Sequence, residues 1–311
     1  MNSNRPGFIK MVRAPFLTSI ISPLIAGTLL AYYISGQFYP LNFALVLILG
    51  ICFHIATNVY NDIYDTLQGT DEINMNRNEF SGGSGVIVND PSVLPEMFRI
   101  ARIALLVAII TSILLLFRVQ SNLKIILVIL TVLSTFFSKY YTAAPIKLAY
   151  RGWGEFSVWF AFGPMAIAVA VIGQNVSLSP VVLIAMPITG ISTLSILLIG
   201  QIIDVDADRA AGKWGVTVRH GRKITGILFV IFQIILCVNI VVLSTIFLSH
   251  GWPILLTLIP YAVILPRLIK TLLLHTNDID MMKKAAGQNV LLHMIFSALF
   301  VITFLILILL R

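Results

Sequence analysis

The chain has 311 residues, of which 58% are hydrophobic and only 11% are charged. Soluble domains carry about 25% charged residues, so this composition excludes an ordinary soluble protein and indicates a polytopic membrane protein. The net charge of +8 comes from basic residues in short loops between apolar runs. That distribution orients a membrane protein and does not indicate nucleic acid as a partner. Cys52 and Cys237 lie in apolar runs and predict neither a disulfide nor a metal site.

Nine apolar segments have the length of about 20 residues that crosses a bilayer. They cover roughly residues 15–35, 41–61, 96–117, 123–142, 154–173, 180–202, 224–248, 252–273 and 286–310. Residues 1–13 are polar and basic, and no small-residue cleavage site follows, so we expect the first segment to be a transmembrane helix rather than a removed signal peptide. The sequence predicts an all-α membrane protein with one domain over residues 1–311.

The charged residues gather on one side of this arrangement. With the N-terminus placed inside, all 13 acidic residues fall inside, whereas of the basic residues considered only Arg118, Lys124 and Arg311 fall outside. This positive-inside bias predicts a cytoplasmic N-terminus and cytoplasmic charged loops, with the bacterial plasma membrane as the default location. We expect the chemistry on the charged face.

Carboxylates cluster at the ends of the second and sixth segments, where burial is costly and a task is expected. In the first cluster, Asn58, Asn61, Asp62 and Asp65 are spaced i, i+3, i+4 and i+7, which predicts one shared helical face. Asp71 follows in the next loop. The alternative is plain solvation of a helix end.

The second cluster predicts a facing set of oxygen ligands. Asp204 and Asp208 are spaced i and i+4 and share a face, from which Asp206 points away. Two such helices suit a hard cation, above all Mg²⁺, which completes its shell with water and substrate phosphate. With no cluster of Cys or His, zinc is not expected.

Basic and tyrosine side chains in the inside loops suggest that the phosphate belongs to a diphosphate, and the apolar body suggests a lipid tail. An allylic diphosphate fits both. For a single residue such as Lys213 or Arg219, a role in topology alone remains the alternative. The predicted diphosphate-binding residues are Arg77, Tyr141, Lys147, Arg151, Arg209 and Lys213.

These residues resemble the UbiA superfamily of intramembrane aromatic prenyltransferases. The family's Asn-Asp-x-x-Asp motif appears as residues 61–65 (the first motif) and its Asp-x-x-x-Asp motif as residues 204–208 (the second motif). The resemblance covers nearly the whole chain. It implies nine helices around a central cavity and transfer of a polyprenyl group from a diphosphate donor to an aromatic acceptor. We assign catalysis to Asp62, Asp65 and Asp208, and Mg²⁺, or Mn²⁺ in its place, to Asn61, Asp65, Asp71, Asp204 and Asp208.

Three stretches resemble the branch that prenylates 1,4-dihydroxy-2-naphthoate for menaquinone. They are residues 69–71, 141–155 and 212–221. Gly69 stands where the ubiquinone branch has a third Asp, which argues against that branch. Ala144 replaces a usual Gly, and Trp214 and Gly215 are unusual. The resemblance implies that the attacked carbon bears a carboxylate and that CO₂ leaves.

Several features keep alternatives open. Aromatic side chains of the fifth span are expected either to stabilise an allylic cation or to face lipid: Trp153, Phe156, Trp159, Phe160 and Phe162. His54 is either an acceptor contact or a hydrogen-bonded structural histidine, and residues 81–85 form either a phosphate-cradling loop or a flexible linker. The rival functions are prenylation of another acceptor, terpene cyclisation, and transport of an ion or phosphate.

Overall fold

The computed structural model describes residues 6–247 and 250–311 and places nine membrane-length apolar helical segments within those ranges. They cover Ala14–Ser35, Pro40–Leu67, Pro91–Leu116, Ser121–Tyr140, Gly154–Gly173, Pro180–Ala210, Arg222–Ile246, Trp252–Leu274 and Ile279–Leu310. No strand occurs in the described ranges. The all-α prediction with nine spans is therefore confirmed, and the chain is an integral membrane protein.

The spans are built from helices and short 3₁₀ or π turns. In chain order the elements are α1 (Phe8–Met11), η1 (Ala14–Leu17), α2 (Thr18–Ser35), α3 (Pro40–Leu67), α4 (Thr70–Ile73), α5 (Val86–Asn89), η2 (Pro91–Val93), α6 (Leu94–Leu116), α7 (Ser121–Tyr140), η3 (Leu148–Arg151), α8 (Gly154–Phe160), η4 (Ala161–Met165), α9 (Ala166–Gly173), α10 (Pro180–Ala210), α11 (Val216–His220), α12 (Arg222–Ile246), α13 (Trp252–Leu255), η6 (Leu256–Leu258), α14 (Ile259–Leu274) and α15 (Ile279–Leu310).

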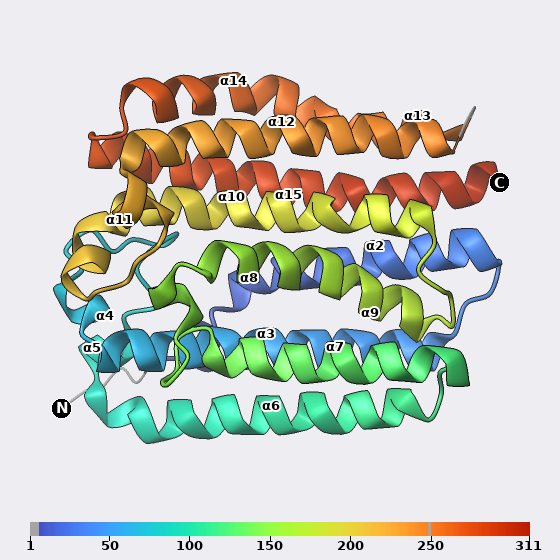
Figure 1. Cartoon of the computed structure of the whole chain (residues 1–311), viewed down its shortest axis with the longest axis horizontal. Helices are drawn as coiled ribbons and strands as arrows, with labels where there is room; N and C mark the ends of the chain where they lie inside the picture. The colour runs from blue at the N-terminus through green and yellow to red at the C-terminus, as the bar shows by residue number, and fades with distance from the viewer. Residues whose placement is uncertain (1–5, 248–249) are drawn as a thin grey trace.

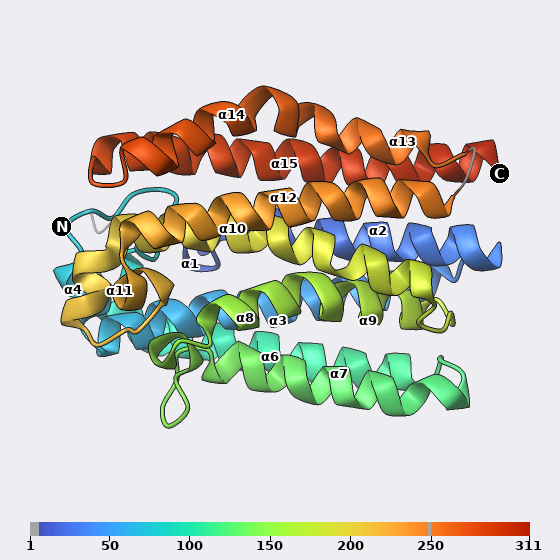
Figure 2. The ribbon, with the colours of Figure 1, turned by 45° about the horizontal axis from the view of Figure 1, so that its top comes forward.

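The long helices run side by side, and the chain reverses direction at each connection (Figure 1). The short elements α4, α5 and α11 gather at one end, beside the N-terminal part of the chain, and the C-terminus lies at the other end (Figures 1 and 2). We call these the charged end and the far end. In the interior, α3 packs against α6, α10 against α12, and α2 against α9 and α15.

The second, sixth and ninth spans are clearly longer than predicted, and the extra turns of the second and sixth carry the motifs. The second span runs to Leu67 and the sixth to Ala210, whereas their apolar runs end near residues 61 and 202. Apolar length therefore underestimates these helices, because their polar last turns stay helical beyond the hydrocarbon region. The predicted seventh span reached residue 248, which lies outside the described residues.

The fifth span contains a π turn, η4, that includes Pro164. Proline lacks the N–H that continues the helical ladder, and π turns often accommodate such a break. Beside it the backbones of two spans touch, because a Cβ on Gly163 would lie 2.5 Å from Met186 O and one on Gly190 would lie 2.2 Å from Trp159 O. These glycines bring α10, which carries the second motif, against the broken span.

Polar side chains close the far end, and we call them the far-end clasp. Asn42 Nδ2 donates to Gly173 O at 2.7 Å, and Arg118 Nε donates to Asn42 Oδ1 at 2.6 Å. Tyr39 N donates to Gln174 Oε1 at 2.8 Å. Asn42 and Gln174 are each 1% exposed. The clasp joins the connections that follow the first, third and fifth spans. It also satisfies backbone groups that a helix end leaves unpaired.

Candidate active site

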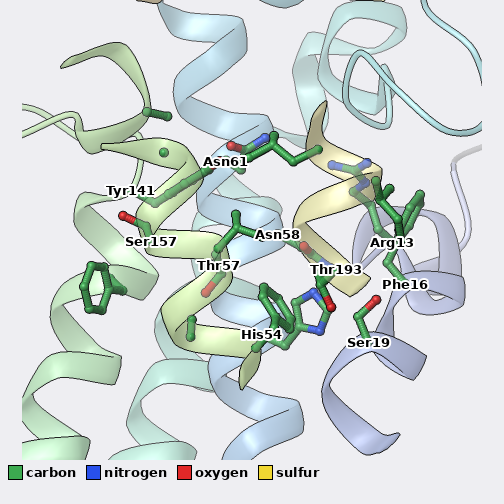
Figure 3. A pocket seen from close by; sticks show the side chains of 18 of the residues that line it. Arg13, Phe16, Ser19, His54, Thr57, Asn58, Asn61, Tyr141, Ser157 and Thr193 are labelled. Carbon is green, nitrogen blue, oxygen red and sulfur yellow. The ribbon is translucent and has the colours of Figure 1, made fainter. Parts of the chain in front are cut away.

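A cavity of about 270 Å³ lies between the spans and extends from the charged end toward the middle of the bundle. Its polar part is lined by Asn61, Asp65, Asp71, Tyr141, Asp204, Asp208 and Lys213. Its apolar part is lined by residues that include Leu24, Leu49, Phe53, Met165 and Val169. Figure 3 shows Asn61 and Tyr141 near one another on this wall, with Asn58, Thr57 and His54 further along α3. The cavity therefore joins a charged head to a hydrophobic body.

Asp65 holds three hydrogen bonds within the site. Its Oδ1 accepts from the Tyr150 hydroxyl at 2.8 Å, and its Oδ2 accepts from Lys213 Nζ at 2.9 Å and from Asn61 Nδ2 at 3.2 Å. Asn61 lies one turn before Asp65 on α3, as the spacing predicted. Because the side chain is only 3% exposed, these contacts hold the carboxylate in one orientation.

Lys213 joins the two motifs. Its Nζ lies 2.9 Å from Asp65 Oδ2 and 3.9 Å from Asp208 Oδ1. Burial alone would lower the pKa of Lys213, but the carboxylates of Asp65 and Asp208 outweigh it and hold that pKa well above its ordinary value. The ammonium stays charged, so it neutralises a pair of carboxylates that face one another across the cavity.

Tyr150, which is buried, and Tyr141, which is partly buried, stay neutral beside these charges. Burial first, and then the Asp65 charge, raises the pKa of Tyr150, and burial likewise raises the pKa of Tyr141. The Tyr150 hydroxyl also contacts Thr70 Oγ1 at 2.6 Å. Tyr150 therefore serves as a hydrogen-bond donor that ties the turn before the fifth span to the first motif.

Asp71 lies on α4 and completes the acidic rim. It is 3% exposed, and its Oδ2 has no hydrogen-bond partner within the described chain. Burial, with the charges of Asp65 and Asp62, raises the pKa of Asp71 to about 8. Gly83 approaches so closely that an added Cβ would lie 2.6 Å from Asp71 Oδ2, and its φ of +71° favours glycine. A positively charged ligand would relieve the unpaired carboxylate.

Residues 81–85 form a folded loop against the acidic rim. Arg77 Nε donates to Gly82 O at 2.7 Å, and its Nη2 donates to Asp71 O. Ser84 N donates to Asp62 Oδ1 at 3.2 Å. This N–H points at a carboxylate of the protein, so the loop packs on the site instead of forming a flexible linker.

Asp62 departs from the predicted shared face. Its side chain is 1% exposed, does not line the cavity, and lies 3.8 Å from Arg13 Nη1 in addition to its contact with Ser84. Consecutive residues differ by about 100° around a helix, so the residue after Asn61 is free to turn toward another neighbour. Asp62 anchors the loop of residues 81–85 and does not face the cavity.

The side chains of the second motif point to two different faces of α10, as their spacing predicted. Asp204 and Asp208 line the cavity, whereas the Asp206 side chain is 67% exposed and pairs with Arg222 at 3.0 Å. Asp204 Oδ1 accepts from Asn74 Nδ2 at 2.8 Å. Asp208 is 5% exposed and has Lys213 as its charged neighbour.

The predicted diphosphate-binding residues separate into two groups. Tyr141 and Lys213 line the cavity, but the other four do not: Arg77, Lys147, Arg151 and Arg209. Arg151 Nη2 donates to Pro145 O at 2.9 Å, on the surface, and Arg209 is exposed on another face of α10. Sequence proximity to the acidic motifs therefore overstated how many basic side chains reach the cavity.

The predicted aromatic wall contributes little to the cavity. Trp153 is 58% exposed and Phe156 is 45% exposed, and of the five predicted aromatic residues Phe162 alone lines the cavity. The lipid-facing alternative holds for Trp153 and Phe156. The aromatic rings that do line the cavity come from four spans and a loop: Phe16, Phe53, Phe80, Phe137, Tyr141 and Phe162.

Residues that sequence reasoning passed over also shape the site. Tyr150 lies within residues 141–155, yet nothing in its spacing marks it as the partner of Asp65. Glu155 accepts from Gln201 Nε2 at 2.9 Å and so links the start of α8 to α10. Arg13 lines the cavity from the turn before α2, and its place just before the first span is the signal that was available.

Fold and site together define an intramembrane enzyme with an acidic head site and an apolar tail cavity. Residues 20–289 match the UbiA prenyltransferase family. The chain belongs to this family and is a prenyltransferase.

Named relatives of this chain include prenyltransferases and phytyltransferases. The chain is 29% identical over 222 residues to a 2-carboxy-1,4-naphthoquinone phytyltransferase of Synechocystis sp., covering 71% of this chain and 68% of that one. It is 29% identical over 223 residues to the 1,4-dihydroxy-2-naphthoate octaprenyltransferase of Escherichia coli, covering 71% and 70%. The match to a chloroplastic phytyltransferase of Arabidopsis thaliana covers 69% of this chain and 55% of the relative, at 28% identity.

Solved structures share the fold. A UbiA homologue from Archaeoglobus fulgidus, bound to DMAPP and Mg²⁺, has a TM-score of 0.63 at 13% identity, covering 98% of this chain and 100% of that one. A UbiA homologue from Aeropyrum pernix has a TM-score of 0.64 at 15% identity, covering 92% and 97%. These likenesses establish a common fold.

Proposed function

We propose that this enzyme transfers a polyprenyl group from an allylic diphosphate to 1,4-dihydroxy-2-naphthoate in menaquinone biosynthesis. The observation that carries the proposal is the meeting of Asp65 and Asp208, from the two motifs, on Lys213 at the head of an apolar cavity. A polar head next to an apolar cavity would suit a diphosphate joined to a hydrocarbon chain, and this supports the proposal. The names of the Synechocystis and Escherichia coli relatives support a two-ring acid as acceptor.

The donor set fits a hard cation such as Mg²⁺. The side chains around the cavity head offer oxygen, and the Oδ2 atom of Asp71 lacks a partner within the described chain. No three acidic, His or Cys side chains of the described residues converge closely enough to hold a metal alone. Mg²⁺ commonly takes a few carboxylates and completes its shell with phosphate and water. The residues proposed to hold it are Asn61, Asp65, Asp71, Asp204 and Asp208.

When bound, Mg²⁺ would neutralise the charge that develops on the departing diphosphate. Lys213 is placed to donate hydrogen bonds to the same group once phosphate oxygens compete for its ammonium. The Tyr150 hydroxyl keeps Asp65 oriented throughout. The apolar wall excludes water, so an allylic cation formed there meets the acceptor ring before it is hydrolysed. Phe162 and Phe137 present ring faces or edges to this space.

The acceptor assignment is tested by product analysis. Purified protein, a polyprenyl diphosphate and 1,4-dihydroxy-2-naphthoate are expected to yield a demethylmenaquinol, CO₂ and diphosphate in equal amounts, and air then oxidises the quinol to demethylmenaquinone during extraction. 4-Hydroxybenzoate is expected to be a poor substitute, because a site that pairs polar groups of two rings leaves some of them unpaired around one ring. Preference for 4-hydroxybenzoate would refute the naphthoate branch. A hydrocarbon formed without acceptor would show a cyclase instead.

We also propose that the charged end faces the cytoplasm of a bacterial plasma membrane. After Cys52 and Cys237 are replaced, a cysteine at Trp214 should react with an impermeant maleimide from the cytoplasmic side, and one at Gln37 from the opposite side. Both native positions are exposed, unlike Lys213, which is held in its ion pair. Labelling of both cysteines from one side would contradict the nine-span topology, and reversed labelling would contradict the orientation.

A further inference from the structure

His54 is a buried imidazole that keeps one ring nitrogen unpaired, among the described residues, beside its side-chain hydrogen bond to Asn58. The side chain is 6% exposed, lines the cavity, and leaves Nδ1 with no partner within the described chain. Its ring meets Phe162 edge-on, with centroids 4.9 Å apart. Buried polar atoms are nearly always paired, so an orphan that faces a cavity requires an explanation. By contrast, both ring nitrogens of buried His293 contact serine hydroxyls, at 3.1 and 2.9 Å.

The position of His54 excludes the diphosphate as its partner. His54 precedes Asp65 by eleven residues on α3, which corresponds to about 16 Å along the helix axis at 1.5 Å per residue. A diphosphate held at Asp65 does not span that distance. A hydrocarbon tail offers no hydrogen bond, so the remaining substrate, the aromatic acceptor, is the one that can satisfy the imidazole.

Arg13 places a guanidinium with spare hydrogen-bond donors on the same cavity. Its guanidinium stacks over Phe16 at 4.7 Å and lies 3.8 Å from Asp62, but it donates no side-chain hydrogen bond within the described chain. Its backbone has a φ of +53°, an unusual conformation for a residue with a side chain. The neighbouring Val12 O accepts from Asn58 Nδ2 at 3.3 Å, which fixes Arg13 near the level of Asn58, one turn from His54.

Figure 3 shows Arg13 on the turn before α2 and His54 on α3, both on the wall of one cavity. A guanidinium at one point and an imidazole about one helical turn away match a ring acid that carries a carboxylate and a hydroxyl. Resting on the proposed function, we propose that Arg13 binds the carboxylate of the aromatic acceptor and that His54 hydrogen-bonds its ring hydroxyl. Both act by positioning the ring below the diphosphate.

The proposal predicts that variants of Arg13 and His54 change KM for the acceptor but not KM for the diphosphate donor. In Arg13→Gln, KM for 1,4-dihydroxy-2-naphthoate should rise about thirtyfold, since a charged hydrogen bond is lost. KM for 1,4-dihydroxynaphthalene, which lacks the carboxylate, should stay within twofold. In His54→Ala, KM should rise about tenfold for both acceptors. KM for the diphosphate donor should stay within twofold in both variants.

Two further variants separate recognition from packing. His54→Asn keeps an amide atom at the position of Nδ1 and should restore most of the acceptor affinity. Arg102→Gln is the matched control for Arg13, because Arg102 also stacks on a phenylalanine, Phe98, at 5.4 Å but does not line the cavity. It should leave both KM values unchanged. Thermal unfolding of each detergent-purified variant shows whether it is folded.

One result would refute the proposed function, and others would refute only the roles proposed for Arg13 and His54. Wild-type protein that prenylates neither naphthalene compound would refute the proposed function. Wild-type turnover with unchanged acceptor KM in Arg13→Gln and His54→Ala would refute this inference alone. A raised donor KM in Arg13→Gln would assign the guanidinium to the diphosphate and also overturn it. If His54→Ala does not fold, Arg13→Gln still decides the role of Arg13, and an acceptor KM raised tenfold or more in His54→Asn would contradict the role of His54.

Discussion

Replacing Asp65 by asparagine is expected to reduce prenyl transfer by at least about a thousandfold, or roughly 4 kcal/mol of transition-state stabilisation. Asparagine keeps an oxygen that accepts from Tyr150, which donates to Asp65 Oδ1 at 2.8 Å, but removes the charge. Asp65→Ala and Asp208→Ala should also abolish turnover. The measurement is pyrophosphate release and prenylated product from purified protein, beside thermal unfolding of the same sample.

Asp206→Asn is the matched control for this experiment. It makes the same chemical change as Asp65→Asn, within the second motif beside Asp208, but its side chain is 67% exposed and pairs with Arg222 outside the cavity. Its activity should fall less than about threefold, because surface ion pairs contribute little. Near-normal activity in Asp65→Asn or Asp208→Ala would contradict the assignment of the site.

Removal of divalent metal is expected to abolish turnover completely. The reason is the oxygen-only donor set and the unpaired Oδ2 of Asp71, which together call for a hard cation near the diphosphate. Protein treated with EDTA and freed of chelator by gel filtration should be inactive and should recover with Mg²⁺. We expect Mn²⁺ to restore activity as well, because it favours the same ligands.

A second readout tests binding without catalysis. Mg²⁺ together with inorganic pyrophosphate should raise the melting temperature of the wild-type protein, since ligands that bind the folded state stabilise it. Asp65→Asn should lose most of this shift, whereas Asp206→Asn should keep it. Turnover that persists after thorough chelation would mean that the carboxylates serve another purpose.

Helical periodicity predicted the fold and much of the acidic site. Long apolar runs fix the number of spans, because few other structures satisfy the backbone in a bilayer. The same periodicity correctly separated Asp206 from Asp204 and Asp208. It also predicted that Asn61 and Asp65 share a face, which their hydrogen bond at 3.2 Å shows.

The features of the site that the sequence did not predict depend mainly on contacts between distant segments. Asp62 turns from the cavity because Ser84, on a loop some twenty residues later, donates to it. Lys213 meets Asp65 across more than a hundred residues, and no local pattern encodes that pair. Arg209 follows Asp208 directly, yet one step around the helix takes it to another face. Aromatic residues surround the start of the fifth span on every side, so their spacing did not select the face that lines the cavity.

The far-end clasp has a consequence for the energetics of the host membrane. Between the cavity and the clasp lie side chains that are fully buried, including Leu30, Val46, Leu115 and Ala170. Ions and protons cross such a dry, hydrogen-bonded seal only at high cost. A prenyltransferase whose cavity opens at one end only can therefore reside in a membrane that holds an ion gradient without dissipating that gradient. Replacing Asn42, which would weaken this seal, should make membranes that contain the protein measurably more permeable to protons.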